Sequence, residues 1–260
     1  MSDTKCVLFV HAHPDDIETL GAGTAALLAR RGHRIVLATL TPGDCGSRDY
    51  SAEELARIRK REAAAAANLI AAEYHCLEFR DLVIFVDDAS RRRVTEFIRR
   101  VRPDLVITSA PADYHCDHEA TSLLVRDACF AAGAPNYRTG SAEPFGHIPH
   151  LYFMDPVEGV DREGNPVPPD FVVNVEKYMD VKRDMLSCHE SQREWLRKHH
   201  GIDDFVGQMV QWTRAAGERV GIRYGEGFRR YKVAPFPQTS LLPELVGEVV
   251  AVMPKPVSAV

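Results

Sequence analysis

The stretch HAHPDDIETLGAG, residues 11–23, places four titratable side chains directly before a glycine-containing helical segment. It follows the apolar run 6–10, which predicts a short buried strand. Pro14 fixes its own backbone and biases the preceding residue, His13, away from helical dihedral angles. The chain therefore leaves the strand extended, and His13 and Asp16 can converge on one point. Folding alone gives no reason for such a cluster, so we interpret it as part of a functional site.

Apolar runs and helical segments alternate along the chain. This alternation predicts an α/β fold, a Rossmann-like parallel sheet with helices on both faces and a smaller C-terminal annex. We expect one domain over 1–232 and a proline-rich arm over 233–260 that packs on the domain or on a neighbour. The expected strands are 6–10, 34–41, 74–79, 104–111, 150–155 and 171–175, and the expected helices are 19–32, 52–72, 90–101, one from about 119, and one long polar helix over 177–199.

Composition narrows the class of protein. The chain has 260 residues, 45% hydrophobic and 27% charged, which is ordinary for a globular protein. The formal charge of -5 and the pI near 6.1 do not indicate binding to nucleic acid. The six cysteines are scattered, without a CxxC pair, and indicate reduced thiols. The N-terminus does not read as a signal peptide, and no apolar run approaches transmembrane length, so we expect a cytoplasmic protein with no membrane partner.

A second polar stretch, DYHCDH at 113–118, follows the predicted strand 104–111. Parallel sheets place their sites at the carboxyl ends of the strands, so this stretch and 11–16 are expected to lie close together. Two nearby ligands and a distant third, all with nitrogen or oxygen donors, fit an open catalytic zinc site. The same donors suit iron, cobalt or manganese.

Hydrolysis at such a metal requires three further groups. Asp15 is next to Asp16 in the sequence and need not bind the metal itself, so it is the candidate base. His115 is the candidate group for stabilising an oxyanion, and Asp117 is the candidate for orienting it. The alternative is that Asp15 or Asp16 only caps the following helix.

The segment GAGTAA, residues 21–26, also matches the G-x-G-x-x-A pattern of dinucleotide-binding folds, and Asp44 lies near the position of a ribose-binding acid. In those folds, however, the glycines follow the first strand at once. Here the HPDD cluster intervenes, so we favour close helix packing as the role of the glycines and keep an NAD-dependent oxidoreductase as an alternative.

AHPDDIE with HCDH downstream resembles the zinc-dependent N-acetylglucosaminyl deacetylase family, the PIG-L or LmbE-like proteins. The resemblance covers most of the chain and implies a Rossmann-like fold. It implies zinc as cofactor, Asp15 as general base, a protonated His115 at the oxyanion and Asp117 as its partner. The zinc ligands that it implies are His13, Asp16 and His118.

The resemblance extends to the substrate side. The later segments FVVNVEKYMDVKRDMLSCHESQ and GIRYGEGFRR are similar to the bacterial branch that includes bacillithiol-biosynthesis deacetylases. Cys116 is a departure, since the family usually has proline there. The residues implied to contact or line the substrate pocket are Arg59 (with Glu62 in R-x-x-E), Gly43, Asp44, Tyr114, Ser191, Gln192 and Glu226.

The sequence thus predicts a zinc hydrolase that deacetylates an N-acetylglucosamine-type small molecule, and the resemblance implies that it forms a homo-oligomer. The alternatives are an amidase of thiol or sugar conjugates on the same fold, the NAD-dependent oxidoreductase, and a binding protein without catalysis. The last alternative is disfavoured because binding alone requires no base beside a metal.

Overall fold

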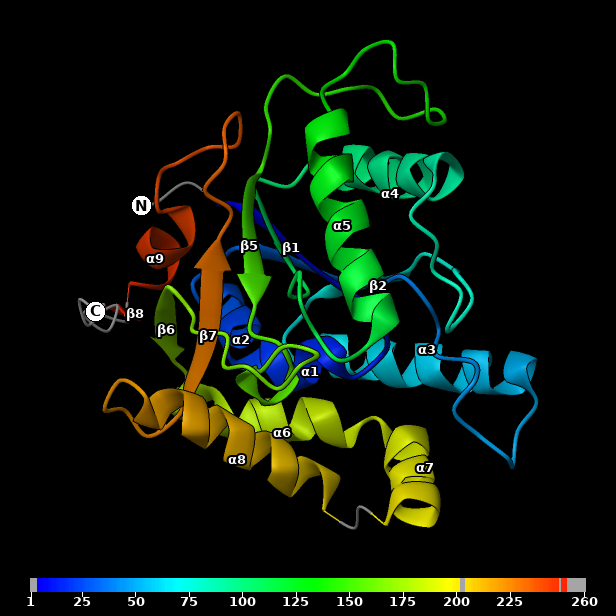
Figure 1. Cartoon of the computed structure of the whole chain (residues 1–260), viewed down its shortest axis with the longest axis vertical. Coiled ribbons are helices and arrows are strands. Elements are labelled where there is room, and N and C mark those ends of the chain that lie inside the picture. Colours follow the sequence, from blue (N-terminus) through cyan, green and yellow to red (C-terminus); the bar gives the residue numbers. More distant parts are fainter. Residues whose placement is uncertain (1–3, 202–203, 248, 252–260) are drawn as a thin grey trace.

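The computed structural model describes residues 4–201, 204–247 and 249–251, and its centre is one eight-stranded sheet (Figure 1). The strand order is β3-β2-β1-β4-β5-β7-β6-β8. The first five strands of that order are parallel, and the other three join them in antiparallel pairs. The strands are β1 Cys6–His11, β2 Arg34–Thr39, β3 Glu73–Cys76, β4 Leu105–Thr108, β5 His150–Met154, β6 Phe171–Asn174, β7 Gly225–Arg230 and β8 Val249–Ala251.

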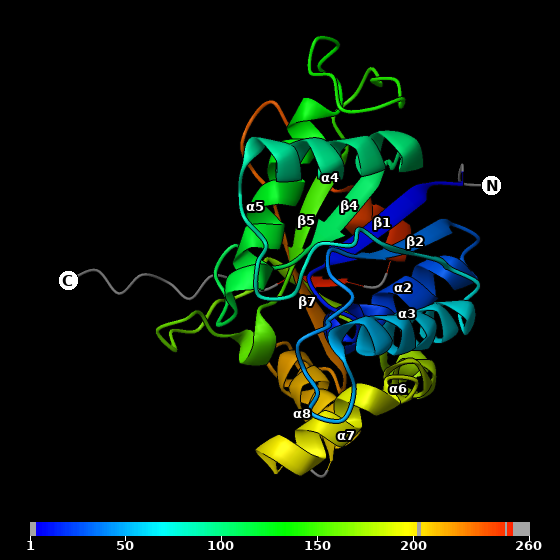
Figure 2. The ribbon, with the colours of Figure 1, turned by 90° about the vertical axis from the view of Figure 1, so that its right-hand side faces the viewer.

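Helices cover both faces of the sheet (Figure 2). Successive residues of a strand point to opposite faces. On β1, Val7 and Phe9 therefore pack with residues of α2, α6 and α8, whereas Leu8 and Val10 pack with residues of α4 and α5. The helices are α1 Asp16–Leu20, α2 Ala22–Arg30, α3 Ala52–Asn68, α4 Asp88–Val101, α5 Cys116–Ala131, α6 Met179–Ser187, α7 Glu190–His200, α8 Phe205–Glu218 and α9 Leu241–Val246.

The predicted α/β class with helices on both faces is confirmed, with three departures. The sheet is mixed rather than wholly parallel. The segment 225–230, which is not among the expected strands, is strand β7 between β5 and β6. The long helix expected over 177–199 is divided into α6 and α7 at His189, whose buried ring contacts Glu18 on α1. That tertiary contact turns the chain where its local sequence contains neither proline nor glycine.

The segment after residue 233 contributes to the same fold. The side chains of Leu242, Leu245 and Val246 on α9 belong to the core beside the sheet, and β8 pairs with β6. Residues 252–260, the end of the predicted arm, lie outside the described part of the chain.

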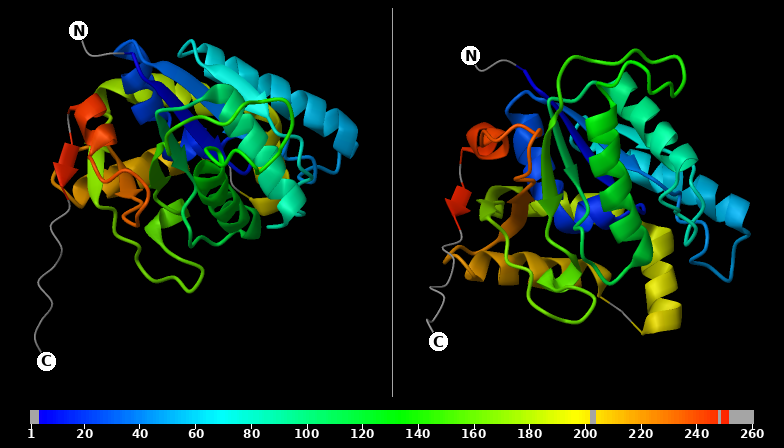
Figure 3. Two further views of the ribbon diagram at one scale, coloured as in Figure 1. Left: turned by 90° about the horizontal axis from the view of Figure 1, so that it is seen from above. Right: turned by 45° about the horizontal axis from the view of Figure 1, so that its top comes forward.

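The carboxyl ends of the parallel strands face α1 and the layer formed by α6 and α8, while α4 lies toward the opposite end of the molecule (Figures 1 and 3). Both polar stretches singled out in the sequence lie at this edge. One follows β1 and begins α1, and the other follows β4 and begins α5. Within the described ranges, no helix combines the length and the apolar character needed to cross a membrane.

Candidate active site

Asp16 joins three histidines at the carboxyl edge of the sheet. Its Oδ2 lies 2.6 Å from His11 Nδ1 and 3.2 Å from His13 Nδ1, and its Oδ1 lies 3.3 Å from His118 Nε2. Burial opposes ionisation of this carboxyl, but the charges of His11 and His118 outweigh it and hold the pKa of Asp16 well below its usual range. The structure therefore brings together the three residues predicted as metal ligands.

His118 is oriented by a carboxylate on its other side. Its Nδ1 lies 2.9 Å from Asp113 Oδ1, and the same oxygen accepts a hydrogen bond from the backbone N–H of His115 (3.1 Å). The Nε2 atom is left to face Asp16. Burial lowers the pKa of His118, but Asp16 and Asp113 raise it overall to about 9. Carboxylates around a buried imidazole thus make this cluster attract positive charge.

His13 has carboxylates on both ring nitrogens. Its Nε2 lies 3.1 Å from Asp81 Oδ1 and 3.3 Å from Asp117 Oδ2, opposite the contact with Asp16. Asp81 is not among the residues chosen from the sequence. A signal was present, since Asp81 follows the predicted strand 74–79 and so reaches the same edge of the sheet.

His11 is the second residue that sequence reasoning missed. It is the last residue of β1 and fully buried, and its ring meets that of His118 edge-on at 4.6 Å between centroids. Its Nε2 has no hydrogen-bond partner among the described residues. Burial lowers the pKa of His11. Its place beside Asp16 is that of a group that orients a ligand rather than of a surface histidine.

Asp15 occupies the N-cap position of α1, but its side chain makes no capping hydrogen bond. Its backbone is left-handed, with φ of 96°, a conformation that a non-glycine residue seldom adopts. Burial and the adjacent charge of Asp16 raise the pKa of Asp15 to about 7. The capping alternative is therefore not supported, and strain of this kind is typical of functional positions.

His115 lies at the N-cap of α5, where its Nδ1 accepts the backbone N–H of Asp117 (3.2 Å). In the neutral ring, the proton must then be on Nε2, which becomes a hydrogen-bond donor. Burial and the charges of His13 and His118 lower the pKa of His115. These influences disfavour the protonated His115 that the resemblance implied, and they favour a neutral ring that donates from Nε2.

The carboxylate of Asp117 is directed to other groups than expected. It lies against His13 and accepts the backbone N–H of Leu82 (2.7 Å), and only the backbone N–H of Asp117 reaches the ring of His115. The resemblance implied a carboxylate that orients His115. The structure places this carboxylate on His13 instead.

Arg59 lies close to the candidate base but is held by the protein. Its Nη2 donates to Gly46 O (3.1 Å) and to the side-chain oxygen of Gln192, while its Nε has no partner among the described residues. A Cβ atom at Gly43 would lie 2.7 Å from Arg59 Nη1, so the loop of residues 41–46 (TPGDCG) passes directly over this guanidinium. Arg59 is among the charges acting on Asp15.

Helix α7 is joined to α3 by the R-x-x-E pattern. Glu62 accepts the backbone N–H of Ser191 (2.9 Å) and its hydroxyl (2.6 Å), beside the Arg59–Gln192 contact. Ser191 and Gln192 therefore connect two helices, and this contact explains their pairing without a substrate. Asp44 accepts the backbone N–H of Asp81 (3.1 Å). Tyr114 is two-thirds exposed at the rim, with its ring edge-on to those of His115 and His118.

Glu226 lies away from the histidine cluster. Its two carboxylate oxygens accept the backbone N–H groups of Gly23 (2.9 Å) and Thr24 (2.7 Å), and its Oε1 is paired with Lys182. Protein donors already engage both oxygens, which gives Glu226 a structural role. It also lines the pocket beside α8, and its contact with substrate stays a prediction.

The same contacts argue against dinucleotide binding. In dinucleotide-binding folds, the helix N-terminus after the glycines receives a pyrophosphate. Here Glu226 occupies the N-terminus of α2. A Cβ at Gly23 would lie 2.7 Å from Val175 Cβ, and one at Gly21 would lie 2.9 Å from Met154 Sδ. The glycines permit close packing, as the sequence analysis favoured.

Comparison with known proteins agrees with this geometry. Residues 8–129 match the family described as PIG-L, GlcNAc-PI de-N-acetylase. The chain is 28% identical over 240 residues to the diacetylchitobiose deacetylase of Thermococcus kodakarensis, covering 88% of this chain and 84% of that protein. It is 26% identical to a probable N-acetyl-alpha-D-glucosaminyl L-malate deacetylase 2 of Bacillus anthracis, covering 82% and 93%.

One relative has a different activity. The 4-oxalmesaconate hydratase of Pseudomonas putida is 26% identical, covering 83% of this chain and 80% of the relative. Among solved structures, the N,N'-diacetylchitobiose deacetylase from Pyrococcus horikoshii superposes with a TM-score of 0.75 at 25% identity, covering 92% of this chain and 89% of the other. The match over residues 8–129 and the shared fold together make the chain similar to the PIG-L de-N-acetylases and their relatives.

Proposed function

We propose that this protein is a metal-dependent hydrolase that removes the acetyl group from a small molecule of the N-acetylglucosamine type. The observation that carries the proposal is Asp15. Its carboxylate makes no capping bond, its backbone is left-handed, and it adjoins the cluster formed by Asp16, His13 and His118. The relatives that are deacetylases of N-acetylated sugars support the substrate class.

The donor set fits a divalent transition metal. His13, Asp16 and His118 would hold it, since Asp16 contacts a ring nitrogen of each histidine and carboxylates on the far side of each ring attract positive charge. Two imidazoles and a carboxylate are typical of open catalytic sites for zinc and suit other divalent metals. Such a metal supplies Lewis-acid chemistry, polarising the acetyl carbonyl and making water a stronger nucleophile.

The protein side chains handle the protons. Asp15 takes a proton from the attacking water and returns it to the nitrogen of the departing amine, giving acetate and a free amino sugar. A base with a pKa near 7 is suited to both transfers at neutral pH. The Nε2–H of neutral His115 donates a hydrogen bond to the oxygen on which negative charge develops.

The hydratase relative defines a second candidate, the addition of water to an unsaturated polycarboxylate. The charges around the site disfavour it here. Five aspartates surround the cluster, and among the described residues Arg59 is the arginine that acts on Asp15, so the side chains offer a polycarboxylate little positive charge beyond that of the metal. The aspartates are Asp15, Asp16, Asp81, Asp113 and Asp117.

The test is the release of free amine from a panel of N-acetylglucosamine derivatives, with and without a chelator. We expect chelator-sensitive release that is restored by adding a divalent metal. Metal content measured on the same samples should show that the His118→Ala variant has lost metal and activity together.

Other results would redirect the proposal. Bound metal without release of acetate, but with release of another acyl group, would favour the amidase alternative. Hydration of a polycarboxylate without amine release would favour the hydratase. A His118→Ala protein that keeps stoichiometric metal would contradict the assigned ligand.

A further inference from the structure

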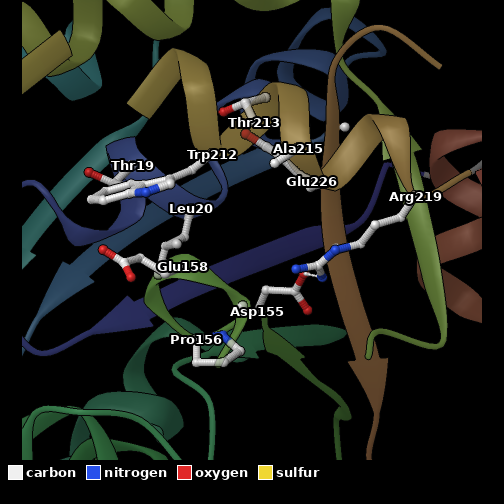
Figure 4. A pocket seen from close by; sticks show the side chains of 14 residues that line it. Thr19, Leu20, Asp155, Pro156, Glu158, Trp212, Thr213, Ala215, Arg219 and Glu226 are labelled. Carbon is white, nitrogen blue, oxygen red and sulfur yellow. Dashed lines mark ion pairs between the residues drawn. The ribbon is translucent and has the colours of Figure 1, made fainter. Parts of the chain in front are cut away.

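A separate pocket lies between helix α8, the segment that follows β5 and the start of β7 (Figure 4). Its volume is about 60 Å³. A cavity needs roughly 10–15 Å³ to hold one water molecule, so this one accommodates a few heavy atoms but not a whole sugar ring. The lining residues used below are Leu20, Asp155, Trp212 and Arg219.

Asp155 is the unusual residue of this pocket. It is 8% exposed, and its Oδ1 has no hydrogen-bond partner among the described residues. Its Oδ2 lies 3.7 Å from Arg219 Nη1, which is beyond hydrogen-bond distance. Leaving a buried carboxylate without donors is costly, and such groups in native proteins call for an explanation. The simplest explanation is a ligand that supplies the missing donor.

The two ends of the pocket differ in chemistry. Trp212 and Leu20 supply apolar surface at one end, where Thr19 and the carboxylate of Glu158 also lie, and the charges of Asp155 and Arg219 form the other end (Figure 4). Asp155 requires a donor, whereas Arg219 offers one. A hydroxyl group donates and accepts at once, so two neighbouring hydroxyls satisfy both residues. The carbon-bound face of the same molecule can contact the indole.

The pocket is connected to the candidate active site through one short segment. Two residues after Asp155, the backbone N–H of Val157 donates to Asp113 Oδ2 (3.3 Å). Asp113 Oδ1 contacts His118 Nδ1 at 2.9 Å. A group seated against Asp155 would therefore lie beside the residues that orient the histidine cluster.

We propose that this pocket binds the hydroxyl-bearing edge of a sugar or polyol next to the deacetylation site. One source is the second unit of an extended amino-sugar substrate, an assignment that rests on the proposed function. The other is a free polyol. Both present the same pair of hydroxyls to Asp155 and Arg219.

The first arm of the test compares two substrates, N-acetylglucosamine and the disaccharide of two such units. We expect Asp155→Asn and Arg219→Gln to lower the ratio of kcat/KM for the disaccharide over the monosaccharide by about tenfold, the effect of one lost hydrogen bond to a charged group. Arg214→Gln is the matched control. It lies on the same helix, is paired with Glu218 and does not line the pocket.

The second arm measures binding without reaction. The chain has two tryptophans, so a Trp195→Phe variant leaves Trp212 as the only indole reporter. Titration with sorbitol should change its fluorescence, and Asp155→Asn should weaken the apparent affinity by about tenfold. Arg219 is exposed, so its variant remains informative if Asp155→Asn fails to fold.

Each outcome decides between the possibilities. If Asp155→Asn and Arg219→Gln lower the ratio of kcat/KM for the disaccharide over the monosaccharide, the second sugar unit is the occupant. Sorbitol binding that depends on Asp155, with an unchanged ratio, identifies a free polyol. If folded variants change neither quantity, the proposal is wrong. If no amine is released from any substrate but sorbitol binding still depends on Asp155, the proposed function fails and the pocket remains.

Discussion

Two buried groups of charged side chains lie on either side of the short helix α1, and they differ in how fully their charges are paired. In the Lys182–Glu226 pair, the lysine also donates to Thr19 O (2.9 Å), and the glutamate accepts two N–H groups at the start of α2. One positive and one negative charge are matched, and each has protein partners.

The histidine cluster has no such balance. Asp16 contacts three imidazoles, but further carboxylates lie on the outer nitrogens of His13 and His118, and the side chain of Asp15 makes no capping bond. Negative charge exceeds what the histidines neutralise. The difference indicates that the Lys182–Glu226 pair, whose charges are fully paired, maintains the fold. The histidine cluster, with its excess of negative charge, is arranged to receive a cation and a substrate.

The largest expected effect is on Asp15. Asp15→Asn keeps the shape of the side chain but removes its basicity, so turnover should fall by about 10²- to 10⁴-fold, the contribution of a general base. Metal content should be unchanged, as checked by elemental analysis of the purified protein. Asp127→Asn, in an ion pair with Arg91 and Arg126, is the control for general loss of a carboxylate. Loss of metal from Asp15→Asn would mean that Asp15 is a ligand.

The Lys182–Glu226 pair should show the reverse pattern. Lys182→Met leaves Glu226 buried without its counter-ion and should lower the free energy of unfolding by about 3–5 kcal/mol, measured by urea denaturation. Activity per folded molecule should be retained. The exposed pair Lys60–Glu78 is the matched case, and Lys60→Met should cost at most about 1 kcal/mol. An equal loss of unfolding free energy in Lys182→Met and Lys60→Met would show that the buried pair contributes no more to the fold than the exposed one.

Asp155 should make stability depend on pH in a defined direction. Burial raises its pKa from 3.8 to about 6, so the folded state binds a proton more tightly than the unfolded state. Stability from this group therefore falls as pH rises from about 4 to about 6, and the loss is complete above that range. Above pH 7, Asp155→Asn should be more stable than the natural protein by about 3 kcal/mol, and the difference should vanish below pH 4.

That difference is measured by denaturation of both proteins across the pH range. Only the pH dependence of the difference is attributed to Asp155, because the other titrating groups are common to both proteins. A difference independent of pH would show that Asp155 is not protonated more easily in the folded protein.

The smallest effect is expected at His11. His11→Phe keeps the ring but removes its contact with Asp16, and metal affinity should weaken by about 10- to 100-fold, as for other residues that orient a metal ligand. Competition with a chelator of known affinity measures this change. His75→Phe, at a half-exposed position, should leave metal affinity unaltered. An unchanged affinity in His11→Phe would limit His11 to packing.

Much of the candidate site follows from local patterns. HPDD and DYHCDH each come directly after an apolar strand, and parallel strands bring their carboxyl ends to one edge. His11 and Asp81 escaped notice for different reasons. His11 belongs to the stretch 11–16 but was given no role there, and Asp81 stands alone in its segment without a neighbouring motif.

By itself, the sequence determined the α/β class and the edge of the sheet where the chemistry lies, whereas the set of His13, Asp16 and His118 was implied by the resemblance. Strand–helix alternation and short-range spacing carry that information because they depend on residues close together in the chain. Tertiary structure alone decided that Glu226 caps α2, that His189 divides a helix, that Asp117 contacts His13, and that Asp155 lines a pocket. Each of these depends on a partner from a distant segment, and whether a buried charge is satisfied is set by the three-dimensional arrangement of its neighbours.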